Sequence, residues 1–157
     1  MDCKIRKAEA RDADMLLFYL GEIAKQHNAG RKDIFKCGSI KYTKEDLLLI
    51  LQDESKPIFV AERDKKVVGY IMCKYRNIKA DILFRDRFVF YIDDLYVDHL
   101  SRGERIGSSL MDIAVAAAKE KQCDAVELNV WEFNKDAIAF YEKYGMKTQR
   151  RILELNI

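Results

Sequence analysis

The chain has 157 residues, 49% of them hydrophobic and 34% charged, which is typical of one globular domain and not of a disordered segment. Its formal net charge of +2 is too small to indicate binding to nucleic acid or to an anionic membrane surface. The four cysteines do not have metal-ligand spacing and there are only two histidines, so no metal site is expected.

The chain shows no sign of division or of membrane targeting. Pro57 is the only proline, and no Gly/Ser-rich linker interrupts the sequence. The N-terminus has no signal-peptide pattern, and no apolar run reaches transmembrane length. We therefore expect a single domain over residues 1–157, cytoplasmic, with reduced cysteines.

In the N-terminal half, hydrophobic periodicity predicts a strand, two helices and a β-hairpin. Asp12 is expected to cap the first helix, and Thr43 and Asp46 have capping-box spacing ahead of the second. The expected ranges are a strand at 3–8, a first helix ending at 28–30, a short helix after Thr43, and hairpin strands at 58–62 and 67–75 joined by a turn at 63–66.

In the C-terminal half, strands and helices alternate. The expected order is a strand at 88–97, a polar turn at 101–107, a helix at 107–121, a strand at 125–131, a helix from Asn134 to Gly145, and a strand at about 146–155. Together the pattern predicts an α/β (α+β) fold with a mixed, mostly antiparallel sheet flanked by helices. If its two strands share one sheet, the strand–turn–helix–strand unit of this half must be a parallel crossover.

The most informative segment is the turn Arg102-Gly103-Glu104-Arg105-Ile106-Gly107-Ser108, which follows a strand and opens a helix. A helix N-terminus offers unpaired N–H groups and partial positive charge, and glycines let a ligand approach the backbone, so the turn suits a phosphate. The alternative is a plain strand-to-helix turn with solvated arginines. The segment is neither a phosphate-binding loop with its lysine nor the dinucleotide motif G-x-G-x-x-G.

This turn resembles the acetyl-CoA signature R/Q-x-x-G-x-G/A of the GNAT superfamily of N-acetyltransferases, in its form R-G-x-G-I-G. Arg102, Gly103, Ile106 and Gly107 match that form. Arg105 departs from it, because the family usually has glycine there. The Arg105 side chain either crowds the backbone N–H or adds a phosphate contact of its own.

Three further segments resemble the same family, in the family's order and spacing. Residues 92–97 resemble the strand before the signature, where polyamine-type members carry an acidic pair like Asp93-Asp94. Residues 128–130 resemble the next strand, which splays from its neighbour to admit the pantetheine arm. Residues 134–146 resemble N-x-x-A-x-x-F-Y-x-x-x-G-F, with Met146 in place of the last phenylalanine.

The resemblance implies a GNAT fold and acetyl-CoA as co-substrate. It implies that the backbone of Leu95 and Val97 holds the pantetheine, with the Leu95 N–H as oxyanion donor, and that the turn cradles the pyrophosphate. Tyr141 would protonate the leaving sulfur, although a core aromatic is the alternative. The implied cofactor-binding residues are Leu95, Tyr96, Val97, Arg102, Gly103, Glu104, Arg105, Ile106, Gly107, Ser108, Asn129, Asn134 and Tyr141.

Asp93 aligns with the acidic residue that polyamine-type relatives use as base or amine ligand. Asp93 and Asp94 are adjacent, so on a regular strand only one faces the acceptor unless a bulge intervenes. Whether Asp93, Asp94 or a water chain serves as base stays open, as does a purely structural acidic pair. A carboxylate more plausibly binds the cation than deprotonates it directly.

The expected function is acetyl transfer from acetyl-CoA to a primary amine, with a small cationic amine as acceptor. The alternatives are a peptide or protein N-acetyltransferase and a non-catalytic acyl-CoA-binding module on the same fold. The expected partners are acetyl-CoA and the amine, without nucleic acid or membrane. Homodimerisation, which is common in relatives, stays open.

Overall fold

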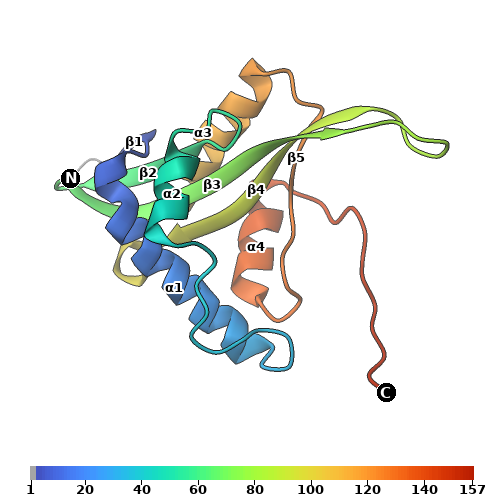
Figure 1. Ribbon diagram of the computed structural model, residues 1–157, viewed down its shortest axis with the longest axis horizontal. Helices are drawn as coiled ribbons and strands as arrows, with labels where there is room; N and C mark the ends of the chain where they lie inside the picture. Colours follow the sequence, from blue (N-terminus) through green and yellow to red (C-terminus); the bar gives the residue numbers. More distant parts are fainter. Residues whose placement is uncertain (1–2) are drawn as a thin grey trace.

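The computed structural model describes residues 3–157, which form one sheet with helices on both faces (Figure 1). None of the helices in this range is both long enough and apolar enough to cross a membrane. The strands are β1 (Lys4–Lys7), β2 (Ile58–Arg63), β3 (Lys66–Ile78), β4 (Arg87–Val97) and β5 (Ala125–Leu128). The helices are α1 (Ala13–Gly30), α2 (Lys44–Leu51), α3 (Ile106–Glu120) and α4 (Lys135–Tyr144), with 3-10 turns at Ala10–Asp12 and His99–Ser101.

The sheet has the order β1-β2-β3-β4-β5. The first three pairs are antiparallel, and β4 with β5 is the single parallel pair. This confirms the predicted mixed, mostly antiparallel sheet and its parallel crossover, which runs through α3. The long β3–β4 hairpin extends beyond the rest of the sheet (Figure 1).

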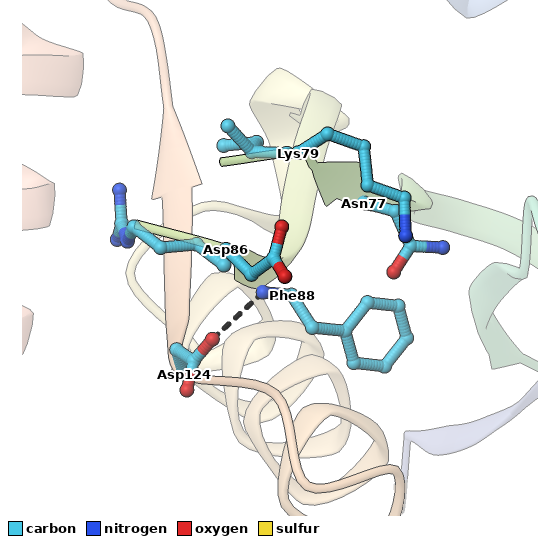
Figure 2. A pocket seen from close by; sticks show the side chains of 7 residues that line it. Asn77, Lys79, Asp86, Phe88 and Asp124 are labelled. Carbon is cyan, nitrogen blue, oxygen red and sulfur yellow. Dashed lines mark hydrogen bonds between the residues drawn. The ribbon is translucent and has the colours of Figure 1, made fainter. Parts of the chain in front are cut away.

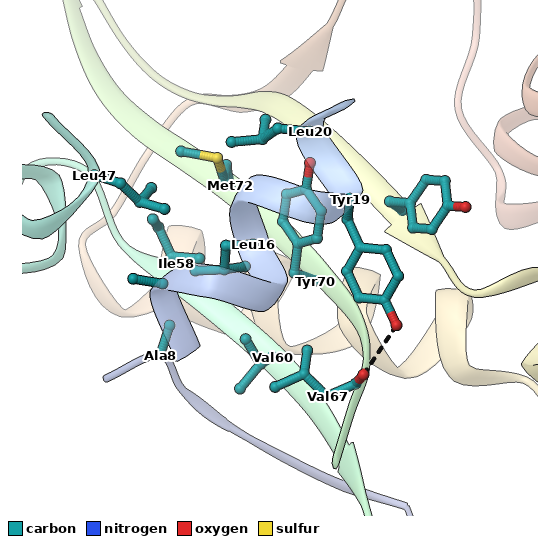
Figure 3. Close-up of a cluster of buried hydrophobic side chains, with 12 residues drawn as sticks. Ala8, Leu16, Tyr19, Leu20, Leu47, Ile58, Val60, Val67, Tyr70 and Met72 are labelled. Carbon is teal, nitrogen blue, oxygen red and sulfur yellow. Dashed lines mark hydrogen bonds between the residues drawn. The ribbon is translucent and has the colours of Figure 1, made fainter. Parts of the chain in front are cut away.

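Each face of the sheet carries its own hydrophobic cluster, because side chains alternate between faces along a strand. On the first face, α1 and α2 cover β2 and β3, and Leu16, Leu47, Val60 and Tyr70 are fully buried there (Figure 3). On the second face, α3 covers the sheet, with its buried residues Leu110, Met111 and Ala114 packed among Ile71, Phe90 and Ile92.

The predicted capping box before α2 is confirmed. The Thr43 hydroxyl accepts a hydrogen bond from the Asp46 N–H at 3.1 Å, and the Asp46 carboxylate accepts one from the Thr43 N–H at 2.9 Å. The predicted cap at Asp12 is wrong, because its side chain makes no capping bond to α1. The Asp12 carboxylate instead accepts from the Glu9 N–H at 2.8 Å and from the Arg6 guanidinium, which a 3-10 turn before α1 makes reachable.

Two predictions near the C-terminus are wrong. β5 ends at Leu128 and not at 131, and no residue of 146–157 lies in a strand. The last segment is extended and exposed, with Ile152, Leu153 and Leu155 each about nine-tenths accessible. Its apolar residues suggested a strand, but a strand also needs a neighbouring backbone to accept its hydrogen bonds, and no strand pairs with this segment in the described part of the chain.

Candidate active site

The site begins where β4 and β5 part. Their parallel pairing ends at Ile92–Leu128, while β4 continues to Val97. The edge of β4 that carries Leu95, Tyr96 and Val97 therefore has no partner in β5, as the resemblance to a splayed strand pair implied. An unpaired strand edge offers N–H and C=O groups to an extended ligand.

The turn after β4 brings backbone N–H groups to the same end of the sheet. Gly103 and Arg105 both adopt left-handed backbone conformations, with φ of 84° and 63°. α3 then begins at Ile106, so Ile106, Gly107 and Ser108 form its first turn, whose N–H groups have no partner within the helix. This arrangement suits an anion such as a pyrophosphate. The conformation of Arg105 also explains why glycine is favoured at this position.

Side chains tie the turn to the sheet. The Arg102 Nε donates to the Val97 carbonyl at 3.1 Å, and its guanidinium lies 5.8 Å from the centre of the Tyr96 ring. Glu104 forms an ion pair with Arg63 of β2. Arg102 and Glu104 thus hold the turn against β4 and β2.

Gly107 sets the position of α4 against α3. A Cβ atom at Gly107 would lie 3.2 Å from the Phe140 ring, which is closer than ordinary van der Waals contact. The absence of a side chain there lets the two helices approach. The next residue of α4, Tyr141, then packs against the second-face cluster.

α4 has both predicted ends. The Asn134 side chain accepts a hydrogen bond from the Ala137 N–H at 3.3 Å, and Gly145 closes the helix with φ of 109°. Burial, together with the negative charge of Asp94 and the nearby Cys73, raises the pKa of the Tyr141 phenol well above its ordinary value. Tyr141 therefore keeps its proton at neutral pH. Asn129 lies just after β5 and is exposed.

A β-bulge places both acidic side chains on one cation. Met72 pairs with Asp94 and Cys73 with Ile92, so Asp93 is the extra residue of β4. The Lys41 ammonium contacts the Asp93 carboxylate at 2.5 Å and the Asp94 carboxylate at 3.1 Å. From the sequence, a bulge was required for both acidic side chains to face the same group. The bulge is present, and the two carboxylates converge on the Lys41 ammonium.

The two carboxylates differ in electrostatics. Burial alone would raise the pKa of Asp93, but hydrogen bonds from Lys41 and from Lys74, at 3.0 Å, bring it below its ordinary value. Burial dominates at Asp94 and raises its pKa despite Lys41. Asp93 is therefore suited to hold a cation, whereas Asp94 has the greater affinity for a proton.

Sequence reasoning missed three residues of this region: Lys41, Lys74 and Tyr70. The Tyr70 hydroxyl is buried without a hydrogen-bond partner, and burial together with Asp94 and Asp93 raises its pKa. Alternation along β3 could have placed Tyr70 on the same face as Met72, but its pairing with Tyr96 depends on strand register. Nothing in the sequence indicated Lys41, because it belongs to an irregular loop.

A separate shallow pocket lies at the other end of β4, at the base of the β3–β4 hairpin (Figure 2). There the Asp124 carboxylate accepts a hydrogen bond from the Phe88 N–H at 2.7 Å. None of the predicted site residues lines it. Its labelled lining residues are Asn77, Lys79, Asp86, Phe88 and Asp124.

Comparison with known proteins identifies the class. The family model for the acetyltransferase (GNAT) family matches residues 17–146, so the chain belongs to this family. This confirms the membership that the sequence predicted. A mutant of the BH1408 protein from Bacillus halodurans has the same fold, with a TM-score of 0.93 and 28% identity, covering 98% of this chain and 99% of that one.

Curated relatives match over a shorter part. MJ1207, an uncharacterized N-acetyltransferase of Methanocaldococcus jannaschii, is 33% identical over 62% of this chain and 42% of its own length. Human N-alpha-acetyltransferase 30 is 35% identical over 60% of this chain and 25% of its own. Pig thialysine N-epsilon-acetyltransferase is 33% identical over 36% of this chain and 34% of its own length. Each match thus covers less than half of the relative's length.

Proposed function

We propose that this protein transfers the acetyl group of acetyl-CoA to the primary amine of a small cationic acceptor, by direct attack in a ternary complex. The observation that carries the proposal is the bulge in β4, which turns Asp93 and Asp94 onto one ammonium group beside the unpaired end of the strand. A chain that already binds an alkylammonium there has the charge needed for a cationic acceptor.

The residues present fit acetyl-CoA. The unpaired edge of β4 at Leu95 and Val97 suits the pantetheine amides, and the turn from Gly103 to Ser108 suits the pyrophosphate. Close packing at Gly107 leaves the N-terminus of α3 beside α4. When bound, acetyl-CoA supplies the acetyl group as an activated thioester.

The chain's own residues divide the remaining work. Asp93 binds the acceptor ammonium, and Asp94, with its raised pKa, takes the proton through water. The Leu95 N–H stabilises developing negative charge on the carbonyl oxygen. Tyr141 keeps its proton at neutral pH, so its hydroxyl is available as a donor to a departing thiolate, and its raised pKa makes the phenol a weaker acid than a free tyrosine.

Two alternative functions would each give a different result in the CoA-release experiment described below. The similarity to human N-alpha-acetyltransferase 30 favours a peptide N-terminus as acceptor, whereas that to thialysine N-epsilon-acetyltransferase favours a side-chain amine. The convergent carboxylates support the second, because they suit an alkylammonium. A non-catalytic acyl-CoA-binding module would bind acetyl-CoA without transfer.

Release of CoA thiol, measured with a panel of amines and peptides, tests the proposal. We expect amine-dependent release with aliphatic diamines and little with peptides that lack lysine. Asp93→Asn should chiefly raise the KM for a cationic acceptor, because it removes one of the two charges. Release with peptide N-termini alone would favour the peptide alternative, and binding without release would favour the module.

A further inference from the structure

Lys41 lies in the loop between α1 and α2, and its ammonium is the only group that contacts both acidic residues of β4 among residues 3–157. Its side chain is 41% exposed, whereas Asp93 and Asp94 are only 13% and 9% exposed. The carboxylates therefore belong to the folded core of the site, and the cation reaches them from outside.

The groups around this ammonium form a complete recognition set. The Lys74 ammonium, contributed by β3, lies 3.0 Å from the Asp93 carboxylate and neutralises part of its negative charge. The Tyr42 hydroxyl lies 3.4 Å from Asp93, and the Tyr42 ring centre lies 5.4 Å from the Lys41 ammonium. Carboxylates and an aromatic face around an alkylammonium are what an amine-binding site needs.

An independent observation points to a ligand beyond Lys41. The Tyr70 side chain is completely buried and its hydroxyl has no partner, although a buried phenol normally has one. Burial, and after it the charges of Asp94 and Asp93, raises the pKa of this phenol. Tyr70 belongs to the same hydrophobic cluster as Met72, the register partner of Asp94. The site thus holds a polar group that Lys41 leaves unsatisfied.

We propose that Lys41 is an internal stand-in for the acceptor, which must displace its ammonium from Asp93 and Asp94 to bind. The inference rests on the proposed function and narrows its substrate class: the acceptor presents a primary ammonium on an unbranched, flexible aliphatic stem, like a lysine side chain. Lys41 thereby weakens the apparent binding only of acceptors whose ammonium needs both carboxylates, which makes it a specificity-determining residue.

The loop is built so that Lys41 can leave. Residues 36–41 are exposed, whereas Thr43 is fixed by its capping box with Asp46. Earlier in the loop, the Phe35 carbonyl accepts a hydrogen bond from Asn28 of α1 at 2.8 Å. The segment between these two fixed points can move without unfolding α1 or α2.

Steady-state acetylation by Lys41→Met tests the inference, with 1,5-diaminopentane and an arylamine that is uncharged at neutral pH as acceptors. When Lys41 occupies the carboxylates, the apparent affinity for the acceptor is reduced in proportion to the fraction of molecules whose site is free. Lys41→Met frees the site, so KM for the diamine should fall roughly three- to tenfold. KM for the arylamine should change less than twofold. Lys44→Met is the matched control, because it removes the same charge from an exposed pair with Asp14 and should leave both KM values unchanged.

An unchanged or raised KM for the diamine in Lys41→Met would overturn the inference, as would an equal fall for both amines or an equal fall in Lys44→Met. Lys41→Gln guards against an effect of the apolar methionine and should reproduce the fall. These outcomes differ from failure of the proposed function, in which the unaltered protein would release no CoA with any amine.

Discussion

Tyr141 lies on an apolar helix stripe, although a catalytic role is proposed for its hydroxyl. It packs among the second-face cluster, as a core aromatic would, yet burial and the nearby Asp94 keep its phenol protonated. The two interpretations are compatible, because the ring packs in the cluster while the charge of Asp94, which lies beyond the end of the β4–β5 pairing, acts on the phenol. Periodicity alone could not separate them.

Tyr141→Phe keeps the ring and removes only the proton donor. We expect kcat to fall about 100-fold, which is within the usual range for loss of a general acid, while acetyl-CoA affinity changes little. Turnover and calorimetric binding should both be measured. Phe140→Leu, which changes a neighbouring packing residue, controls for disturbance of α4. Unchanged turnover in Tyr141→Phe would remove this residue from the mechanism.

Arg105 is the residue where local conformation and family pattern disagree. Its φ of 63° is strained for a side chain with a Cβ atom, so Arg105→Gly should raise the free energy of unfolding by up to about 1 kcal/mol. Arg105→Ala keeps the strain and should give no such gain. Urea unfolding measures the stability of both variants. A loss of stability in the glycine variant alone would contradict the inference that the Arg105 backbone is strained.

The same two variants decide what the Arg105 side chain does for the ligand. If the guanidinium contacts phosphate, both variants weaken acetyl-CoA binding. If the side chain crowds the backbone N–H, both strengthen it.

At the scale of elements, a buried ion-pair cluster joins β1, β2 and the start of α1. The Arg6 guanidinium contacts Asp12 at 2.7 Å and Glu62 at 2.6 Å, and Arg6 and Asp12 are 12% and 5% exposed. Burial would raise the pKa of Asp12, but the bonds from Arg6 and the Glu9 N–H lower it overall. The carboxylate is therefore charged in the folded protein.

Asp12→Ala should lower the free energy of unfolding by about 3 kcal/mol, because it leaves part of a buried charge unpaired. Asp14→Ala, which removes an exposed partner of Lys44, should cost less than about 0.5 kcal/mol. Since the pKa of Asp12 is lowered by folding, its contribution is present above the unfolded pKa near 4 and is lost as pH falls through the folded value. Equal costs for the two variants at pH 7 would contradict this account.

The sequence predicted these elements well where the signal is local. The capping box at Thr43, the cap at Asn134 and the glycine at 145 all have the expected partners or conformation. The predicted helix cap at Asp12 is wrong because the Asp12 carboxylate instead accepts a hydrogen bond from Arg6, which belongs to another element. Capping follows from neighbouring residues, whereas competition from a distant side chain does not show in the sequence.

At the scale of the molecule, the candidate site depends on contacts that no local pattern encodes. The acidic pair and the signature turn were recognisable, but the bulge that unites Asp93 and Asp94 depends on register with Met72 and Cys73. Lys41 reaches them across more than fifty residues of chain. Both follow from tertiary packing and not from spacing.

The C-terminal segment is the clearest structural error of sequence reasoning, and it gives a test. Residues 148–157 make only exposed contacts, such as Arg31–Glu154 at 2.6 Å and Gln149–Glu127 at 2.9 Å. Truncation after Lys147 should therefore change the free energy of unfolding by less than about 1 kcal/mol. A loss of several kcal/mol in urea unfolding would show that the segment pairs as a strand in solution.

We propose above all that the unpaired end of β4 and the turn at Arg102–Ser108 bind acetyl-CoA. The most direct test is the melting temperature at saturating acetyl-CoA, with ATP at the same concentration as control. A ligand that binds only the folded state raises it by mass action, so we predict a clear rise with acetyl-CoA and little with ATP. No rise with acetyl-CoA, or an equal rise with both ligands, would contradict the account.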